Sequence, residues 1–285
     1  EQRHVAADGE TTSDLASHAG REALMSAGVS AADIDAIIIA TTTPDDTFPA
    51  TAASVQAKLE AHHAFAFDVQ AVCAGLVYGL DVGDALIKSG KARKVLVIGA
   101  ETFTRILDWE DRSTAVLFGD GAGAVVLEAS VNTPDWGILS SSLYTDGRFR
   151  DLLYVDGGVS KTGDVGHVRM KGNEVFRHAV EKLSASLDAA LSLSGLAAED
   201  IDWLVPHQAN VRIIDSMQRK LGMDTNKVIR TVAKHANTSA ASIPLALNAA
   251  VKDGRIGAGH VVAFEAIGGG LTWGAALARM GRPEG

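Results

Sequence analysis

Three polar side chains are candidates for a nucleophilic site. The single cysteine, Cys73, ends an extended apolar stretch and precedes a glycine-bearing helical pattern, so we expect its sulfur at a helix N-terminus. The helix dipole would favour the thiolate there, whereas a lone cysteine can equally be a small buried apolar side chain. His207 follows an apolar run, where α/β sheets place ligands, and Asn237 precedes a helical pattern that it could cap. Together the three would suit nucleophilic catalysis.

The elements that would position these residues alternate along the chain. Short, continuously apolar runs predict strands buried on both faces, at 36–40, 95–99, 124–127, 204–205 and 261–264. Helical patterns lie between them, at 13–27, 51–59, 74–88, 173–193 and 239–251. This alternation predicts an α/β fold with a mainly parallel sheet and right-handed crossovers.

The chain also resembles itself. Residues 28–38 match residues 195–205, an offset of 167, with five of eleven positions identical and three more exchanged between aliphatic residues. Later segments match in the same order, so we predict two similar halves, residues 1–132 carrying Cys73 and residues 133–285 carrying His207 and Asn237. A strand expected near 136–144 opens the second half, and we expect that its counterpart and the following loop are missing from the first. Cys73 aligns with Ala240, which predicts that the cysteine and asparagine loops meet at the centre.

Composition excludes several classes of protein. The 285 residues include 26 basic and 35 acidic side chains, a net charge of −9, which argues against a nucleic-acid binder or a polybasic membrane binder. One cysteine excludes a disulfide framework, and no apolar run approaches the ~20 residues of a membrane span. No secretory signal opens the chain, so we expect a cytoplasmic protein. The glycine-rich segment 119–124 precedes a strand where the dinucleotide fingerprint precedes a helix, which argues against a nicotinamide-dependent oxidoreductase.

Four segments resemble a known family, the thiolase-like condensing enzymes, and within it most of all the β-ketoacyl-[acyl-carrier-protein] synthases III. They are Asp68-Val-Gln-Ala-Val-Cys-Ala-Gly, Val205-Pro-His-Gln-Ala-Asn, His235-Ala-Asn-Thr-Ser-Ala-Ala-Ser and Gly268-Gly-Gly-Leu-Thr-Trp-Gly. In this superfamily elongation synthases carry a second histidine, and thiolases a second cysteine, where this chain has Asn237. Plant-type polyketide synthases share the Cys-His-Asn set but carry Gly-Phe-Gly-Pro-Gly in place of the last segment.

The resemblance implies a fold and a reaction. The fold would be thiolase-like, with two pseudo-symmetric α/β halves whose central, mainly parallel mixed sheets lie in a layered α-β-α-β-α arrangement. The reaction would initiate type II fatty acid synthesis: Cys73 is acylated by a short acyl-coenzyme A such as acetyl-coenzyme A, then condensed with malonyl-acyl carrier protein as carbon dioxide leaves. His207 and Asn237 would stabilise the enolate, and the backbone N–H groups of Cys73 and Gly269 would form the oxyanion hole. The alternatives are a Cys-His-Asn synthase of secondary metabolism with another primer or acceptor, and a silent carrier-binding subunit, which would lack the cysteine.

The same resemblance implies binding residues and partners. Contacts to the acyl carrier protein are expected from Gln208, Ala209, Asn210, Val211, Arg212 and Arg177. Contacts to coenzyme A or pantetheine are expected from Arg112, Gly172, Asn173, Ala209 and Asn210. Phe48 would cross a homodimer interface and close the partner's acyl pocket around a short primer, with strand 95–99 offering apolar material for the interface. The thioester and the phosphopantetheinyl carrier are substrates, so no cofactor or metal is expected.

Overall fold

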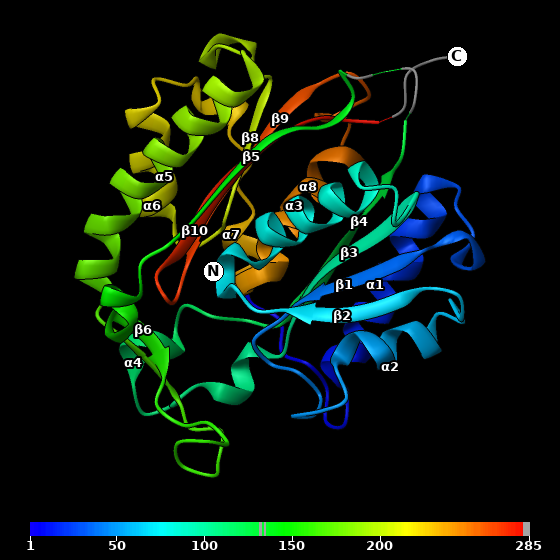
Figure 1. Cartoon of the computed structure of the whole chain (residues 1–285). Coiled ribbons are helices and arrows are strands. Elements are labelled where there is room, and N and C mark those ends of the chain that lie inside the picture. The colour runs from blue at the N-terminus through cyan, green and yellow to red at the C-terminus, as the bar shows by residue number, and fades with distance from the viewer. Residues whose placement is uncertain (131–132, 134, 282–285) are drawn as a thin grey trace.

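Two mixed β-sheets alternate with three layers of helices in the computed structural model, which describes residues 1–130, 133 and 135–281 (Figure 1). Helices α1 (Thr12–Ala27) and α2 (Thr51–Lys58) cover the outer face of one sheet, and α5 (Gly172–Ser194) and α6 (Val211–Lys220) cover the outer face of the other. Between the sheets lie α3 (Gly75–Lys88) and α8 (Ser242–Lys252). The expected five-layered α/β arrangement is confirmed.

The first sheet has the order β2-β1-β3-β4. Its strands are β1 (Ala36–Ala40), β2 (Phe65–Val69), β3 (Lys94–Glu101) and β4 (Gly121–Glu128). β1 runs parallel to both β2 and β3, and only β4 is antiparallel to its neighbour. The strand predicted at 36–40 is confirmed, and its five residues are completely buried.

The second sheet has the order β5-β10-β9-β8. Its strands are β5 (Gly137–Thr145), β8 (Trp203–Pro206), β9 (Val261–Gly268) and β10 (Thr272–Arg279). Only β8 and β9 are parallel, so the expectation of mainly parallel pairing is wrong for this sheet. The reason is the short glycine turn between β9 and β10, because a turn of this length joins only antiparallel strands.

Smaller elements complete the described chain. They are the helices α4 (Arg112–Ala115) and α7 (Val232–His235), an antiparallel pair of strands, β6 (Leu153–Val155) and β7 (Val168–Met170), and seven 3-10 segments, two of which, η2 (Val72–Ala74) and η7 (Ser239–Ala241), lie at the molecular centre. A capping box between Thr11 and Asp14 starts α1.

The internal duplication is visible in the strand registers. Ile38 pairs with Val97 in the first sheet, and Val205 pairs with Phe264 in the second, so both partners are shifted by 167 residues. Each half continues with an antiparallel strand, β4 or β10. In the second sheet β5 pairs with the far edge of β10, whereas no described strand pairs with the equivalent edge of β4. The division at 132/133 falls between β4 and β5, beside residues 131, 132 and 134, which lie outside the described residues, and it stays a prediction.

Glycines bring the central helix α3 close to the first sheet. A Cβ at Gly75, Gly79 or Gly83 would lie 2.8 Å from a side-chain carbon of Ala40, Val97 or Leu127, respectively. These glycines recur every four residues and therefore share one face of the helix. Their missing side chains let α3 pack directly on β1, β3 and β4, which fixes the loop immediately before it, where Cys73 lies.

Candidate active site

Cys73 lies in the 3-10 turn η2, between β2 and α3. The expected strand-turn-helix placement is therefore confirmed, and the side chain is buried at 2% exposure. The preceding Val72 has φ +50°, a left-handed conformation that a β-branched residue adopts at a cost in strain. The turn also packs against the end of β9, since a Cβ at Gly268 would lie 2.6 Å from the Cys73 backbone nitrogen. Only glycine fits beside the cysteine loop at this position.

Burial dominates the ionisation of Cys73. The pKa of its thiol is raised to about 12, chiefly by desolvation; Ser239 lowers it, and the charge of Glu101 raises it by a smaller amount. The resting group is therefore a thiol, in contrast to the thiolate expected from its helix N-terminus, because a helix dipole is a small effect beside complete burial. Ser239 Oγ lies near both Cys73 and Glu101 and lowers both pKa values, without reaching hydrogen-bond geometry with either.

Glu101 is a buried carboxylate at the end of β3 that sequence reasoning did not identify. Its oxygens accept hydrogen bonds from the hydroxyl of Thr43 at 2.7 Å, from the hydroxyl of Thr41 at 3.3 Å and from the backbone N–H of Thr42 at 3.1 Å. Desolvation nevertheless raises its pKa. The run of three threonines and this glutamate stand about 60 residues apart, so only the fold brings them together.

His207 directly follows β8, as expected, and is 5% exposed. Its backbone N–H donates to the carbonyl of Glu265 at 2.8 Å, and its ring Nδ1 lies 2.6 Å from the hydroxyl of Ser242. Burial lowers the pKa of the imidazole to about 3, so the ring is neutral at physiological pH. A neutral imidazole carries one N–H, which is the kind of donor that an enolate oxygen needs.

Asn237 lies between α7 and η7 and is 6% exposed. Its side-chain oxygen accepts the backbone N–H of Ser239 at 2.9 Å. The N-caps of η7 and α8 are Thr238 and Ala241, so Asn237 does not cap the helix that follows. Its backbone is held on both sides, because its N–H donates to Leu117 and its carbonyl accepts from Gly119, each at 3.0 Å. With Oδ1 occupied, the amide nitrogen on the other side of the group is free to donate to a ligand.

The fold brings the three predicted residues to one place. The η2 turn with Cys73 contacts η7, which follows Asn237, and β9, which pairs with the strand leading to His207. A Cβ at Gly99 would lie 2.2 Å from the carbonyl oxygen of Ala240, so the asparagine loop lies directly on β3. Val72 and Ser239, again 167 residues apart, share a φ near +50°. The two loops therefore meet at the centre as pseudo-symmetry mates, as the alignment of Cys73 with Ala240 predicts.

The glycine turn after β9 is fastened to the cysteine loop. The Thr272 hydroxyl lies 2.9 Å from the carbonyl of Ala71 and 3.1 Å from the carbonyl of Gly269. Gly269 is itself buried, and a Cβ there would lie 2.7 Å from the carbonyl of Leu153. This places the predicted oxyanion residue beside the cysteine loop, while the role of its N–H stays a prediction.

The predicted carrier contacts divide into exposed and buried residues. Val211 and Arg212 are exposed at the start of α6, where the Asn210 side chain accepts the Ile213 N–H at 3.1 Å as its cap. Gln208, in contrast, is completely buried. Its amide donates to the carbonyls of two residues and accepts the backbone N–H groups of two more, namely Pro206, Ile229, Thr231 and Val232. A carrier protein cannot reach this side chain, so its expected contact is corrected to a structural role.

The remaining predicted binding residues lie on the surface. Arg112 is exposed at the start of α4, Gly172 and Asn173 are exposed at the start of α5, and Arg177 is exposed one turn further along that helix. Ala209 is half-buried between β8 and α6. Because α4 contacts β7, which leads directly into α5, these residues belong to neighbouring elements.

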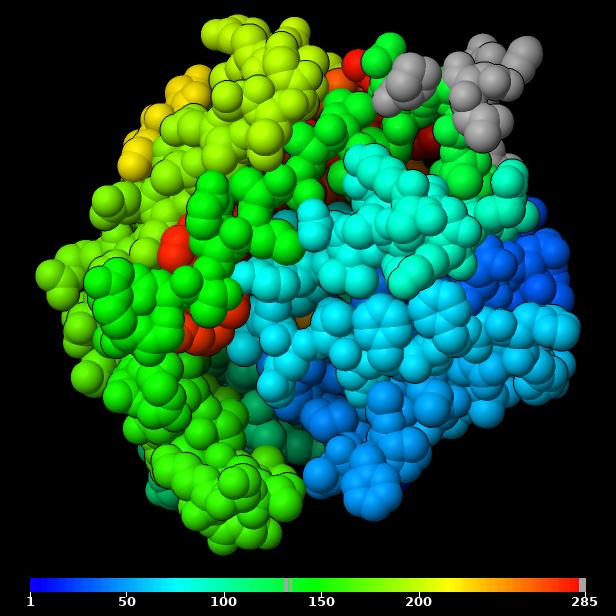
Figure 2. Space-filling model, in the orientation of Figure 1, coloured from blue at the N-terminus to red at the C-terminus, as the bar shows by residue number. Residues whose placement is uncertain are grey.

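Phe48 is 84% exposed in the loop between β1 and α2. The strand at 95–99, expected to supply an interface, is instead β3 at the centre of its sheet, where Val95 through Ile98 are completely buried, so that expectation is wrong. One edge of this sheet is β2, where Phe65 is 43% exposed and stacks on Phe67. Figure 2 shows the segment around β2 (cyan) at the surface of the molecule.

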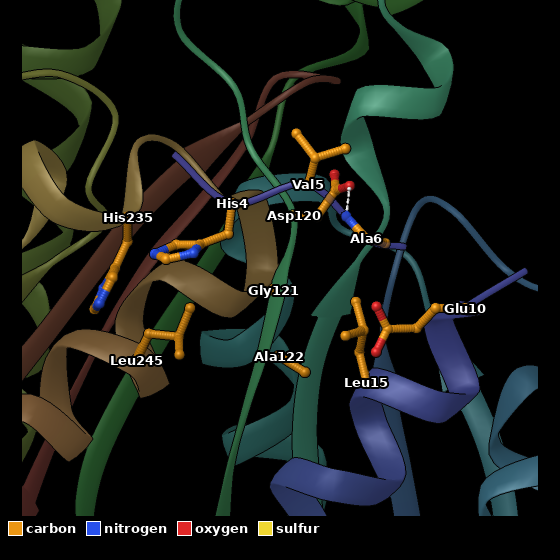
Figure 3. Close-up of a pocket in the computed structure, with 10 residues that line it drawn as sticks. All are labelled: His4, Val5, Ala6, Glu10, Leu15, Asp120, Gly121, Ala122, His235 and Leu245. Atoms are coloured by element: carbon orange, nitrogen blue, oxygen red, sulfur yellow. Dashed lines mark hydrogen bonds between the residues drawn. The ribbon is translucent and has the colours of Figure 1, made fainter. Parts of the chain in front are cut away.

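A separate cavity of about 370 Å³ lies along the unpaired edge of β4 (Figure 3). Its lining includes His4, Asp120 and His235, and it contains none of Cys73, His207 and Asn237. Desolvation lowers the pKa of His235, whose Nδ1 makes no hydrogen bond within the described chain. His235 therefore belongs to this cavity and to packing.

The described residues contain neither a cluster of metal-ligating side chains nor a membrane-spanning helix. No three His, Cys, Asp or Glu side chains there are grouped to hold a metal ion. No described helix is long and apolar enough to cross a membrane.

Comparison with known proteins gives one consistent family. Residues 67–147 match 3-oxoacyl-[acyl-carrier-protein] synthase III, and residues 191–280 match the C-terminal part of the same family. The β-ketoacyl-[acyl-carrier-protein] synthase III of Paramagnetospirillum magneticum is 61% identical over 98% of this chain and 87% of its own length. The synthase III of Rhodospirillum centenum is 62% identical over 97% of this chain and 86% of its own length.

Solved structures agree with the sequence relatives. The 3-oxoacyl-[acyl-carrier-protein] synthase III of Aquifex aeolicus superimposes with a TM-score of 0.92 at 46% identity, over 98% of this chain and 87% of that one. The priming β-ketosynthase of the R1128 polyketide pathway gives 0.90 at 33% identity, over 99% and 85%. The chain belongs to the β-ketoacyl-[acyl-carrier-protein] synthase III family of thiolase-like condensing enzymes.

Proposed function

We propose that this acyltransferase, the initiating condensing enzyme of fatty acid synthesis, uses Cys73 as nucleophile and His207 and Asn237 as paired hydrogen-bond donors. The observation that carries the proposal is the meeting of the three loops at the centre. The acceptor atom of Asn237 is occupied by Ser239, and Nδ1 of His207 is occupied by Ser242. Each side chain is therefore left with a donor for a ligand beside the cysteine.

In the first stage the Cys73 sulfur attacks the carbonyl carbon of an acyl-coenzyme A. A carbon–sulfur bond forms to the enzyme, the bond to coenzyme A breaks, and the departing thiolate takes up the proton that the Cys73 thiol has lost. We propose that the backbone N–H groups of Cys73 and Gly269 stabilise the tetrahedral oxyanion. The absence of a side chain at Gly269 supports this, because a Cβ there would collide with neighbouring backbone.

In the second stage malonyl on the acyl carrier protein loses carbon dioxide, and its α-carbon attacks the acyl-cysteine. The pair of electrons from the broken carbon–carbon bond is held as an enolate, whose oxygen accepts hydrogen bonds from His207 and Asn237. Both donors are neutral and buried, so they stabilise the developing charge without a change in their own protonation. The carbon–sulfur bond to the enzyme breaks, the 3-oxoacyl carrier leaves, and the departing Cys73 thiolate takes up a proton from solvent to regenerate the thiol. These steps need no cofactor beyond the two substrates.

Recognition of the carriers is assigned to exposed charges and polar groups near α4, α5 and α6. Arg212 and Arg177 would meet the acyl carrier protein, together with Val211, Ala209 and Asn210. Arg112, Gly172 and Asn173 would bind the coenzyme A or pantetheine chain, again with Ala209 and Asn210. Exposed arginines suit phosphate groups, which supports this division.

The primer and the assembly are also proposed. The free edge of β2, with exposed Phe65, and the exposed Phe48 suit a homodimer in which Phe48 closes the partner's acyl pocket around an acetyl primer. We place the enzyme in the cytoplasm, where its one unpaired cysteine would stay reduced.

A second candidate function is priming of a secondary metabolite, favoured by the similarity to the R1128 priming β-ketosynthase. Steady-state assays with acyl-coenzyme A primers of two to eight carbons, each with malonyl-acyl carrier protein, separate the two. The fatty acid assignment predicts the highest kcat/KM for acetyl-coenzyme A and no turnover by Cys73→Ala. A preference for a longer or branched primer by at least tenfold would favour the second function. Product formation by Cys73→Ala would contradict the assignment of the nucleophile.

A further inference from the structure

Ser242, the first residue of α8, is the side-chain partner of the His207 ring. Its hydroxyl oxygen lies 2.6 Å from Nδ1, and the two residues are 1% and 5% exposed. The same oxygen lies 3.2 Å from the backbone nitrogen of Gln208. Ser242 thus holds both the ring of His207 and the peptide that follows it.

The direction of the Nδ1 hydrogen bond follows from this arrangement. The Gln208 N–H can only donate, so it occupies a lone pair of the Ser242 oxygen. Within the described part of the chain, Nδ1 of His207 is the remaining hydrogen-bond partner of that hydroxyl. The hydroxyl proton therefore goes to Nδ1, which acts as the acceptor. In a neutral ring the other nitrogen, Nε2, then carries the proton.

The hydroxyl has no competing helix-capping role. The N-cap of α8 is Ala241, and no side chain caps this helix. A serine that only stabilised the helix end would instead bond to the exposed amides of its own first turn. Here the hydroxyl is directed across the molecule to the loop after β8.

The internal duplication supplies an independent comparison. A shift of 167 residues takes His207 to Ala40 and Ser242 to Gly75. These two residues are also in contact, since a Cβ at Gly75 would lie 2.8 Å from Ala40 Cβ. The same pair of positions is therefore apolar in the first half and hydrogen-bonded in the second. Ala40 and Gly75 show that packing at these two positions needs no polar group. The Ser242 hydroxyl therefore accompanies the imidazole of His207 in the second half.

We propose that Ser242 is a positioning residue that fixes His207 as the Nε2-protonated tautomer. The proposal rests on the donor role given to His207 above. Together with Ser239, whose N–H occupies Oδ1 of Asn237, it makes residues 237–242 the segment that sets the direction of both donors. Without the hydroxyl, the ring would populate both tautomers, and one of them presents a lone pair to the enolate.

The tautomer is measured directly by NMR of protein labelled with ring-¹⁵N histidine. The chain has 9 histidines, and the signals of His207 are identified by their loss in His207→Ala. We expect a protonated Nε2 and an unprotonated Nδ1 in the unaltered protein at neutral pH. A protonated Nδ1 would overturn the proposal, and this result needs no Ser242 variant to fold.

Variants then connect the tautomer to the reaction. We expect Ser242→Ala to give a mixture of tautomers and to slow decarboxylation of malonyl-acyl carrier protein roughly tenfold, the effect of one lost hydrogen bond. Acylation of Cys73 by acetyl-coenzyme A should be unchanged. Ser242→Thr keeps a hydroxyl and should restore the Nε2-protonated form. Ser186→Ala is the matched control, because it removes an equally buried hydroxyl that bonds only to the carbonyl of Leu183.

The outcomes distinguish the two claims. A pure Nε2-protonated ring and an unchanged decarboxylation rate in Ser242→Ala would overturn the positioning role. A mixed tautomer in Ser242→Ala, with normal decarboxylation by both that variant and His207→Ala, would support the positioning role and contradict the donor role of His207. If Ser242→Ala does not fold, the tautomers of the unaltered protein and of Ser242→Thr decide the question.

Discussion

Replacement of Asn237 by aspartate changes the chemistry of the site while preserving its local fold. The side-chain oxygen of Asn237 accepts the Ser239 N–H at 2.9 Å, and a carboxylate oxygen can accept the same hydrogen bond. What changes is the other side of the group, where an amide donor becomes a negatively charged acceptor. Because the side chain is only 6% exposed, water cannot screen that charge from an enolate.

The magnitude follows from the number of donors. Loss of one oxyanion donor costs about 2.7–4 kcal/mol of transition-state stabilisation, or roughly 10²–10³ in rate, and the added repulsion increases the loss. We therefore expect Asn237→Asp to lower the condensation rate by at least about 10³. Acylation of Cys73 should stay within about threefold, because it uses the backbone oxyanion hole.

Two assays separate these effects. Intact mass spectrometry after a short exposure to acetyl-coenzyme A follows acylation, and release of labelled carbon dioxide from malonyl-acyl carrier protein follows the second stage. Asn237→Ala is the matched control, since it removes the donor without adding a charge and should fall between the two. Condensation by Asn237→Asp within tenfold of the unaltered enzyme would refute the donor role of Asn237.

Three further changes test other parts of the account. Gly268→Ala would place a Cβ 2.6 Å from the Cys73 backbone nitrogen. We therefore expect this variant to lose acylation of Cys73 and to have a lowered Tm. Normal acylation would show that the cysteine loop and the end of β9 can separate. Arg212→Glu, at the exposed start of α6, should raise KM for malonyl-acyl carrier protein about tenfold and leave KM for acetyl-coenzyme A unchanged. The increase in KM should become smaller at higher salt concentration, because salt screens exposed charges. Equal changes in the two KM values would contradict the assignment of Arg212 to the carrier protein. Burial raises the pKa of Glu265 from 4.5 to about 8. The folded state therefore retains a proton that the unfolded chain loses above pH 4.5. The contribution of this group to the free energy of unfolding is lost as the pH rises through 8. From pH 5 to 8 the contribution of Glu265 amounts to about 3 kcal/mol, so in urea unfolding the stability of the unaltered protein should fall by that amount relative to Glu265→Gln; an equal pH dependence of the two would contradict the buried proton.

Most of the architecture was predictable because it is recorded in local patterns. Continuous apolar runs located β1, β3, β4, β8 and β9, and the duplication predicted the two meeting loops. The helix α6 was not predicted, although its cap Asn210 and the apolar spacing of Ile213 and Met217 are a helix signature. Strand direction in the second sheet failed for another reason, since a buried run looks the same in parallel and antiparallel neighbours.

The polar network around the site is a property of the fold. Glu101 and its threonine partners, and the pair His207 and Ser242, are joined across 35 to 60 residues of sequence. No local spacing predicts such pairs. The ionisation of Cys73 also depended on the fold, because burial and its position at a helix N-terminus act in opposite directions and only the structure shows that burial is complete. Gln208 was placed at a carrier surface by its position in a motif, whereas its four backbone hydrogen bonds are visible only in three dimensions.

The most direct test of the central claim is the mass of the intact protein through one catalytic cycle. After exposure to acetyl-coenzyme A, we expect the protein to gain one acetyl group that maps to Cys73, and to lose it when malonyl-acyl carrier protein is added as 3-oxoacyl carrier appears. Cys73→Ala should gain nothing. An acetyl group on another residue, or one on Cys73 that malonyl carrier does not discharge, would contradict the assignment of Cys73 as the nucleophile of condensation.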